Sequence, residues 1–163
     1  MMIRVLLLMV LLGVGLVRAA ESTWLPIERQ VAELTRSQDV TVVHFWAPWC
    51  SNCTAELTKE GWSSFLAANP KVKFIFVTSF HDEDGRAFLE RYGLGRQANF
   101  QLLLHPNASR KTEDKMTTFM DLPVVWIPST WVFRDGKLCY ALNYGEVRFP
   151  VLQQMVKDAT STW

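Results

Sequence analysis

Two apolar runs in the first half of the chain predict buried strands. Residues 40–47 (VTVVHFWA) and 71–80 (KVKFIFVTSF) are rich in β-branched and aromatic residues, and His44 is the main polar interruption of the first run. Continuous runs of this kind are typical of central strands that helices cover on both faces. Residues 100–106 (FQLLLHP) form a third, shorter candidate strand.

Segments with helical periodicity lie between and around these runs. The spacing of apolar residues predicts helices over residues 25–38 and 50–69, and a shorter one over residues 82–94 that ends at Gly93. Residues 109–120 are charged and predict a short helix or a loop. The positions expected to face inward on the first two helices are Ile27, Val31, Leu34, Leu57, Phe65 and Leu66.

The C-terminal part of the chain predicts a hairpin and a closing helix. Residues 129–144 contain two strand-like runs joined through Asp135-Gly136, a strong signal for a tight β-turn. Residues 146–160 predict a helix with Pro150 in its first turn. Strands joined by helices pair in parallel, whereas the two strands of a hairpin pair antiparallel. The sequence therefore predicts an α/β fold with a central mixed sheet flanked by helices.

The N-terminal 20 residues predict an export signal. Arg4 precedes an apolar run at residues 5–17, and small residues follow it. This is the layout of a secretory signal peptide, and the run is shorter than the roughly 20 residues that a membrane-spanning helix needs. We therefore predict a signal peptide at residues 1–20 and one domain at residues 21–163. An uncleaved N-terminal membrane anchor is the alternative.

Charge and cysteine content narrow the classes of function. The 163 residues carry a net charge of +1 without a basic block, which argues against nucleic-acid binding. Three cysteines are fewer than a disulfide-stapled secreted domain usually carries, and their number is odd. We expect Cys139 to be a buried small hydrophobic residue, and a third redox thiol is the alternative. The close pair of Cys50 and Cys53 therefore needs a chemical explanation.

The pair lies where the first strand is expected to give way to a helix. A helix N-terminus offers free amides and a positive dipole, which favour a thiolate on Cys50. A thiolate attacks disulfides, and Cys53, on the same helical face, can attack the mixed disulfide that results. A structural disulfide would close too short a loop to stabilise the fold much, and a zinc site lacks a second paired spacing of ligands. Redox exchange is the preferred interpretation.

Pro128 supplies a second signal. It stands at the start of a predicted strand, directly after Ile127, where it cannot donate a ladder hydrogen bond. A cis peptide bond beside a site is one explanation, and an ordinary trans proline at a strand start is the other.

Together, the segments FWAPWCSNC (residues 45–53) and IPSTWVFRDGK (residues 127–137) resemble the thioredoxin superfamily, over essentially the whole chain from Trp24 onward. Residues 82–125 are longer than the matching part of plain thioredoxin. With the predicted signal peptide, this resembles the exported TlpA-like thiol–disulfide oxidoreductases. The resemblance implies a thioredoxin-like fold with an insertion before the cis-proline strand, and a location in the bacterial periplasm or cell envelope.

The resemblance also implies roles in catalysis. Cys50 matches the exposed nucleophile and Cys53 the buried resolving cysteine. Pro128 matches the cis-proline that packs against the disulfide. The redox-active disulfide Cys50–Cys53 would then be the only redox group, with no cofactor and no metal.

Other positions match substrate contacts. Ile127 matches the residue whose backbone pairs with an extended substrate chain, as in strand addition. Trp46 and Trp49 match the tryptophans beside the site. Trp126, two residues before the proline, is a candidate lining residue of the substrate groove.

Two positions depart from the family pattern. Ser51-Asn52 stands where thioredoxin has Gly-Pro, so the reduction potential of the family cannot be transferred. His44 stands where thioredoxin has a buried Asp. We predict that His44 aids proton transfer to or from Cys53, because an imidazole titrates near neutrality. A packed strand histidine is the alternative.

The sequence as a whole predicts an exported enzyme that reduces protein disulfides by dithiol–disulfide exchange. The expected partners are protein thiol or disulfide substrates and a membrane thiol donor that re-reduces the pair. We expect a monomer. A disulfide oxidase or isomerase with the same residues stays open, as do a soft-metal (copper) binding protein that uses both thiolates and an idle interaction domain.

Overall fold

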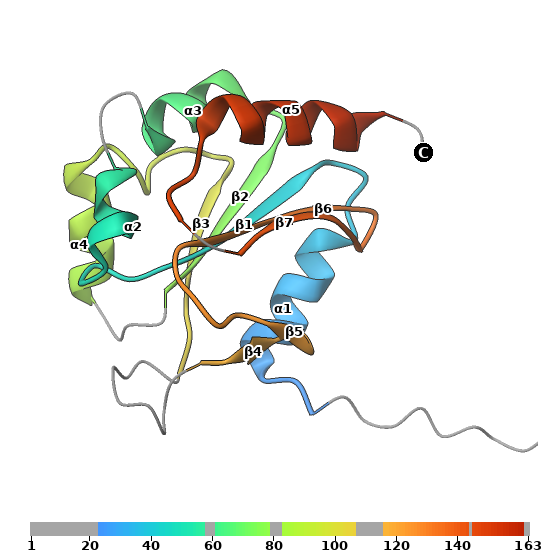
Figure 1. Ribbon diagram of the computed structural model, residues 1–163, viewed down its shortest axis with the longest axis horizontal. Helices are drawn as coiled ribbons and strands as arrows, with labels where there is room; N and C mark the ends of the chain where they lie inside the picture. The colour runs from blue at the N-terminus through green and yellow to red at the C-terminus, as the bar shows by residue number, and fades with distance from the viewer. Residues whose placement is uncertain (1–22, 58–60, 79–82, 107–115, 144, 162–163) are drawn as a thin grey trace, which may run out of the picture.

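A mixed five-stranded sheet forms the centre of the molecule (Figure 1). The computed structural model describes residues 23–57, 61–78, 83–106, 116–143 and 145–161. The strand order is β3-β2-β1-β6-β7; β1, β2 and β3 run parallel, and β6 and β7 are antiparallel additions. The strands are β1 (Thr41–Trp46), β2 (Lys73–Thr78), β3 (Phe100–Leu104), β6 (Ser129–Arg134) and β7 (Lys137–Leu142). This confirms the predicted α/β class and mixed sheet.

Helices cover both faces of this sheet. One face packs against α1 (Pro26–Thr35). The other packs against α2 (Ser51–Ala55), α3 (Trp62–Ala68), α4 (Glu83–Arg91) and α5 (Phe149–Thr160). Strand β1 serves both cores, because alternate side chains point to opposite faces. Val43 and Phe45 lie in the α1 core, and Val42, His44 and Trp46 point towards α3 and α5.

The hairpin and the closing helix follow the prediction closely. Asp135 and Gly136 join β6 to β7 with φ angles of 51° and 73°, which are the left-handed values that a tight hairpin turn requires. Pro150 lies in the first turn of α5. Among the described residues, no helix has the length and apolar character that crossing a membrane requires. The predicted signal peptide at residues 1–20 lies outside the described residues.

The prediction of one continuous helix over residues 50–69 was wrong, because this segment contains two separate helices. Helix α2 ends at Ala55, and α3 begins only at Trp62. Gly61, the residue before α3, has φ −92° and ψ −133°, which is not a helical conformation. A glycine inside a helix costs about 1 kcal/mol relative to alanine, so this position favours a break.

A second small hairpin was not predicted. Strands β4 (Thr118–Phe119) and β5 (Leu122–Pro123) pair antiparallel, where the sequence suggested a charged helix or loop. Met120 and Asp121 turn the chain with φ angles of 51° and 60°. Phe119 is fully buried and adds to the core on the α1 face. Residues 109–115 of that prediction lie outside the described residues.

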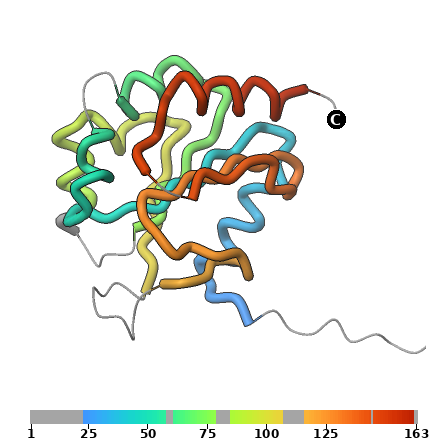
Figure 2. The backbone as a smooth tube through the Cα atoms, in the orientation of Figure 1, coloured from blue at the N-terminus to red at the C-terminus, as the bar shows by residue number. Residues whose placement is uncertain are grey.

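The β4–β5 hairpin is tied to helix α1. The carboxylate of Glu28 accepts hydrogen bonds from the backbone N–H groups of Leu25 and Met120, each at 2.6 Å. The indole N–H of Trp24 donates to Asp121 at 2.7 Å. Figure 2 follows the chain from this hairpin to the start of β6. Ile127, on that path, has its carbonyl oxygen 3.6 Å from Sγ of Cys50.

Candidate active site

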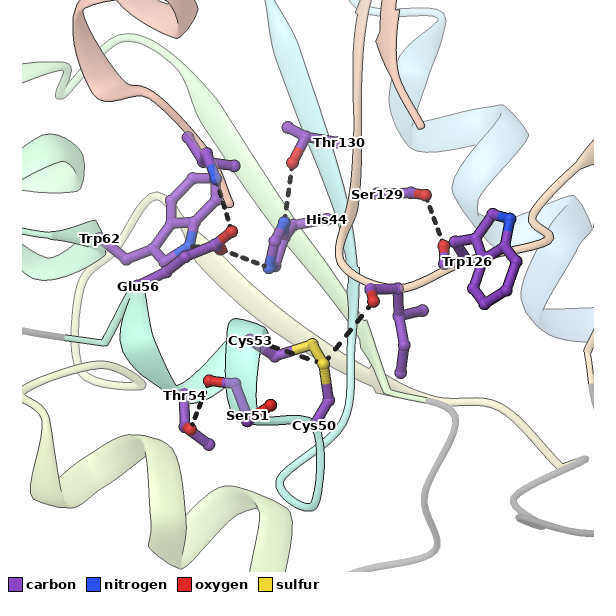
Figure 3. The surroundings of a disulfide bond; sticks show 12 residues. His44, Cys50, Ser51, Cys53, Thr54, Glu56, Trp62, Trp126, Ser129 and Thr130 are labelled. Carbon is purple, nitrogen blue, oxygen red and sulfur yellow. Dashed lines mark hydrogen bonds and ion pairs between the residues drawn. A yellow bond between two sulfur atoms is a disulfide. The ribbon is translucent and has the colours of Figure 1, made fainter. Parts of the chain in front are cut away.

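The two cysteines lie at the start of helix α2, shortly after the end of β1 at Trp46 (Figure 3). Cys50 is the N-cap residue with an extended backbone, and its own N–H donates to the carbonyl oxygen of Ala47 at 3.1 Å. Its Sγ accepts a hydrogen bond from the backbone N–H of Cys53 at 3.3 Å. The two residues form a disulfide. The structure thus places the pair at the predicted strand-to-helix junction.

The two sulfur-bearing residues differ in their access to solvent. Cys50 is half-buried, whereas only 1% of Cys53 is exposed. Cys53 is part of the hydrophobic core under α3 and α5. An incoming sulfur atom can therefore approach Cys50 and not Cys53.

The segment before β6 faces the cysteine pair. The Ile127-Pro128 peptide bond is cis, as the sequence suggested. The Sγ of Cys50 lies 3.6 Å from the carbonyl oxygen of Ile127. Trp126 is 58% exposed, and the hydroxyl of Ser129 donates to its carbonyl oxygen at 2.6 Å. The exposed side chain of Trp126 therefore lies next to the segment that contacts Cys50 (Figure 3).

The other two tryptophans of the motif have different surroundings. Trp49 is half-buried and directly precedes Cys50. Trp46 is 1% exposed and packs against Phe76 and Phe88. Trp49 is therefore the one that adjoins the cysteine pair, and Trp46 belongs to the core on the α4 side.

His44 lies on β1 in a buried polar pair. Its Nε2 is 3.4 Å from Oε2 of Glu56, and its Nδ1 is 2.9 Å from the hydroxyl oxygen of Thr130. The rings of Trp62 and Phe76 pack against it, with centroid distances of 4.5 and 4.7 Å. Burial lowers the pKa of His44 to about 3, so the imidazole is neutral at physiological pH. A neutral imidazole can still pass a proton between its nitrogens, so its role in proton transfer stays a prediction.

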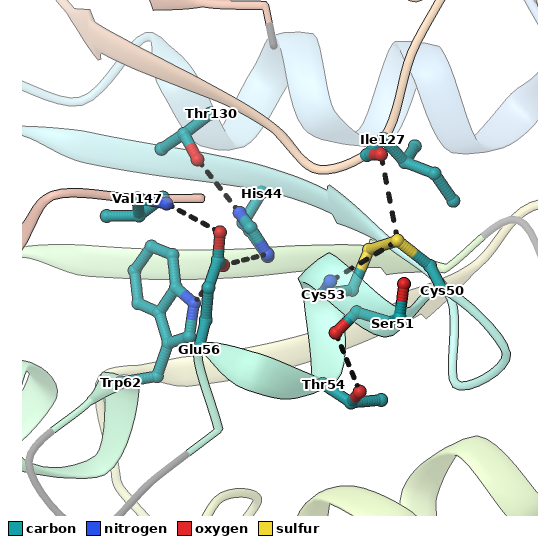
Figure 4. Close-up of polar contacts among 10 residues, drawn as sticks. All are labelled: His44, Cys50, Ser51, Cys53, Thr54, Glu56, Trp62, Ile127, Thr130 and Val147. Carbon is teal, nitrogen blue, oxygen red and sulfur yellow. Dashed lines mark hydrogen bonds and ion pairs between the residues drawn. A yellow bond between two sulfur atoms is a disulfide. The ribbon is translucent and has the colours of Figure 1, made fainter. Parts of the chain in front are cut away.

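Glu56 is a candidate residue that the sequence reasoning missed. It follows Cys53 by three residues and caps the C-terminus of α2. Its Oε2 accepts from the indole N–H of Trp62 at 2.9 Å, and its Oε1 accepts from the backbone N–H of Val147 at 2.6 Å (Figure 4). Burial raises its pKa to about 7, against the opposing effect of these two hydrogen bonds. The available signal was an acidic residue one helical turn after Cys53, next to an inward-facing leucine.

Cys139 is separate from this group. It lies on β7 and is half-buried, where the sequence predicted full burial. Within the part of the chain that the structure describes, no three His, Cys, Asp or Glu side chains gather as a metal site would need.

Known proteins that resemble this chain include thiol–disulfide oxidoreductases. No family model matches the chain. The chain is 21% identical over 139 residues to sporulation thiol-disulfide oxidoreductase A of Bacillus subtilis, covering 84% of this chain and 73% of that protein. It resembles the crystal structure of a secreted disulfide oxidoreductase of Mycobacterium tuberculosis (24% identity, TM-score 0.56, 77% of this chain and 85% of that one). A thiol:disulfide interchange protein of Chlorobium tepidum is also similar (14% identity, TM-score 0.58, 79% and 85%).

The likenesses to the two solved structures extend over about three quarters of the chain. The β1–α2 junction carries the cysteine pair, and the cis-proline segment faces it across the end of the sheet. The chain therefore has a thioredoxin-like fold, the fold it shares with these thiol–disulfide oxidoreductases.

Proposed function

We propose that the protein is an extracytoplasmic thiol–disulfide oxidoreductase that reduces disulfides of protein substrates through Cys50 and Cys53. The observation that carries this proposal is the unequal access to the two residues, half-buried for Cys50 and 1% exposed for Cys53. This asymmetry suits one attacking and one resolving thiol. Similarity to an oxidoreductase of Bacillus subtilis supports the class of reaction.

In the first step, the Cys50 thiolate attacks one sulfur of a substrate disulfide. A mixed disulfide forms between Cys50 and the substrate, and the other substrate sulfur leaves as a thiolate. The N–H of Cys53, 3.3 Å from the Cys50 sulfur, stabilises the attacking thiolate by a charge-assisted hydrogen bond.

In the second step, Cys53 loses its thiol proton and attacks the sulfur of Cys50. The Cys50–Cys53 disulfide forms, and the second substrate sulfur leaves as a thiolate. The substrate gains two electrons in total, and its thiolates take up two protons. Glu56 is the buried group suited to receive the proton of Cys53, because it lies one helical turn away and its pKa is about 7.

The substrate chain runs along the segment before Pro128. An extended peptide can pair with the backbone of Ile127 while its cysteine reaches Cys50, 3.6 Å from that carbonyl oxygen. Val125 and Trp126, 52% and 58% exposed, offer apolar surface to the neighbouring substrate side chains. Substrates with an apolar residue next to the reactive cysteine are therefore preferred.

The cycle is completed outside the cytosol. Residues 1–20 direct export, either as a cleaved signal peptide or as a membrane anchor. A membrane thiol donor returns the pair to the dithiol form, and the protein acts as a monomer. Cell fractionation, with the N-terminal sequence of the exported protein, tests export and cleavage. Sedimentation tests the monomeric state.

The experiment that tests the proposed direction is the reduction potential of the Cys50–Cys53 couple. The mature protein is equilibrated against glutathione and dithiothreitol buffers. A potential near roughly −270 mV supports a reductase, whereas one near roughly −120 mV changes the function to a disulfide donor. The absence of a reversible couple contradicts both and directs attention to binding of a soft metal such as copper, which metal analysis of protein purified under reducing conditions then checks.

A second experiment identifies the substrates. Cys53→Ser keeps the attacking thiol and removes the resolving one, so mixed disulfides on Cys50 accumulate. Cys50→Ser is the matched control and traps none. Equal trapping by the two variants would contradict the assigned roles.

A further inference from the structure

A line of three buried polar side chains connects α2 with β6 (Figure 4). Oε2 of Glu56 lies 3.4 Å from Nε2 of His44, and Nδ1 of His44 lies 2.9 Å from Oγ1 of Thr130. His44 and Thr130 are each 1% exposed, and so is the carboxylate side chain of Glu56. One end of this line is one turn from Cys53, and the other is two residues from Pro128.

The hydrogen-bonding groups in this line allow two arrangements. A neutral imidazole has one N–H that donates and one nitrogen that accepts, and a hydroxyl can do either. When Glu56 is ionised, it accepts from Nε2–H of His44, and Nδ1 accepts from the hydroxyl of Thr130. When Glu56 is protonated, it donates to Nε2, and Nδ1–H donates to Oγ1 of Thr130. The same heavy-atom distances serve both arrangements.

We propose that His44 is a positioning residue that reverses its tautomer whenever Glu56 gains or loses a proton. Passing from the first arrangement to the second adds one proton to the three side chains. In net terms, Glu56 gains an O–H, His44 exchanges its Nε2–H for an Nδ1–H, and Thr130 keeps its hydroxyl proton. His44 carries no charge in either arrangement. The reversal transmits the protonation of Glu56 to the strand that begins beside Pro128.

The surroundings of the line favour an uncharged His44. The rings of Trp62 from α3 and Phe76 from β2 cover the imidazole, and Thr130 faces it from β6. Glu56 is the acidic partner described for His44. Burial lowers the pKa of His44 to about 3, which supports the neutral form.

The groups that face Glu56 come from several elements. The indole N–H of Trp62 and the backbone N–H of Val147 donate to its carboxylate, and His44 faces it from β1. The charge of Glu146 opposes its ionisation. Cys53 precedes it by one turn of α2. The donors hold the carboxylate in one position, so a change of its protonation is passed to His44 rather than relieved by rotation.

The test is the tautomer of His44 as a function of pH. The oxidised wild-type protein is labelled with 15N-histidine and with 13C at the Glu carboxyl carbons, and both are followed by NMR. We expect the Nε2–H tautomer above the midpoint of the Glu56 titration and the Nδ1–H tautomer below it, with one common midpoint. A His44 that becomes doubly protonated at that midpoint, or that keeps one tautomer while Glu56 titrates, would overturn the proposal.

Variants test whether the tautomer of His44 and the titration midpoint of Glu56 depend on each other. In Glu56→Gln, the tautomer of His44 should be constant from pH 5 to pH 9. In His44→Phe, both forms of Glu56 lose a hydrogen bond to His44, but the bond lost by the ionised form is charge-assisted and stronger. The midpoint of Glu56 should therefore rise by about one pH unit, an approximately tenfold drop in its acid dissociation constant. An unchanged Glu56 midpoint in His44→Phe contradicts the proposal.

Thr130 has a matched control on β1. Thr41 is also fully buried, and its hydroxyl has no hydrogen-bond partner among the described residues. Thr130→Val should displace the common midpoint and Thr130→Ser should retain it, whereas Thr41→Val should leave it unchanged. Equal midpoints in Thr130→Val and Thr41→Val would show that Thr130 takes no part in the coupling between Glu56 and His44.

The consequence for exchange rests on the proposed function. The pH profile of kcat/KM for disulfide reduction by His44→Phe should be displaced by the same amount as its Glu56 midpoint. The NMR titration uses oxidised protein without substrate. A His44 tautomer that stays fixed while disulfide exchange is normal therefore refutes only the proposed tautomer reversal. A normal tautomer reversal without any exchange refutes only the proposed function.

Discussion

Glu56→Gln keeps the shape of the buried side chain and removes its ability to ionise. In the wild-type protein, burial raises the pKa of Glu56 from 4.5 to about 7. The folded protein therefore holds a proton on Glu56 at pH values where the unfolded chain has released it. A group of this kind contributes stability that is fully present below pH 4.5 and is lost as the pH rises through 7. The glutamine variant has no such contribution.

The size of the effect follows from the two pKa values. Each unit of pKa difference corresponds to roughly 1.4 kcal/mol, so the full effect of a shift from 4.5 to about 7 is about 3 kcal/mol. Most of it falls between pH 5 and pH 8. Over that interval, the wild-type free energy of unfolding should fall by about 2 to 3 kcal/mol relative to that of Glu56→Gln. The titration of His44 in the unfolded chain is common to both proteins and cancels in the difference.

Urea unfolding of the oxidised proteins at pH 5, 6, 7 and 8 measures this difference. Glu33→Gln is the control, because Glu33 is an acidic residue with 71% of its side chain exposed. Its difference from wild type should stay within a few tenths of a kcal/mol at every pH. A flat difference for Glu56→Gln across the same range would refute the raised pKa of Glu56, and with it this residue as the proton acceptor of Cys53.

Three other predictions concern the substrate surface, the contact between α1 and the β4–β5 hairpin, and the β6–β7 turn. Trp126→Ala should raise KM about tenfold for substrates with an apolar residue beside the cysteine, and leave the rate with dithiothreitol unchanged, because exposed apolar surface is lost without disturbing the cysteines. Glu28→Ala should lower the free energy of unfolding by about 3 kcal/mol, since two backbone N–H groups lose a charged acceptor, and Glu33→Ala should change it little. Gly136→Ala should cost about 1 kcal/mol in thermal unfolding, because φ is +73° and a Cβ would meet Arg36 at 3.4 Å; Gly145→Ala, with φ +86° and open space, should cost less.

The parts of the fold that the sequence predicted are those with strong local signals. The apolar run around β1 and the Asp135-Gly136 turn define their elements without help from distant residues. The β4–β5 hairpin has no such signal, because its strands have two residues each and its turn uses Met120 and Asp121 at positive φ. It is held by contacts with distant residues, such as the hydrogen bond from Met120 to Glu28 on α1, which no local pattern reveals.

The site shows the same division. Cys50, Cys53 and the Ile127-Pro128 bond could be predicted because each has a distinctive residue type at a distinctive position. Glu56 could not, since a glutamate in an amphipathic helix is usually a solvent-facing residue. Its burial depends on Val147, which is 91 residues away and donates to its carboxylate.

The two buried titratable groups act in opposite directions on stability, and their combination suits proton exchange. The pKa of His44 falls from 6.5 to about 3, so its contribution is present above pH 6.5 and is lost as the pH falls through 3. The contribution of Glu56 is lost as the pH rises through 7. Between about pH 3 and pH 7, the His44 imidazole and the Glu56 carboxyl group are both mostly uncharged. Near pH 7, Glu56 is about half ionised. A solvent-exposed glutamate would be almost fully ionised there and too weak a base to take a thiol proton. In the proposed mechanism, the stability lost by burying Glu56 is offset in function, because it gives the cysteine pair a proton acceptor that works at neutral pH.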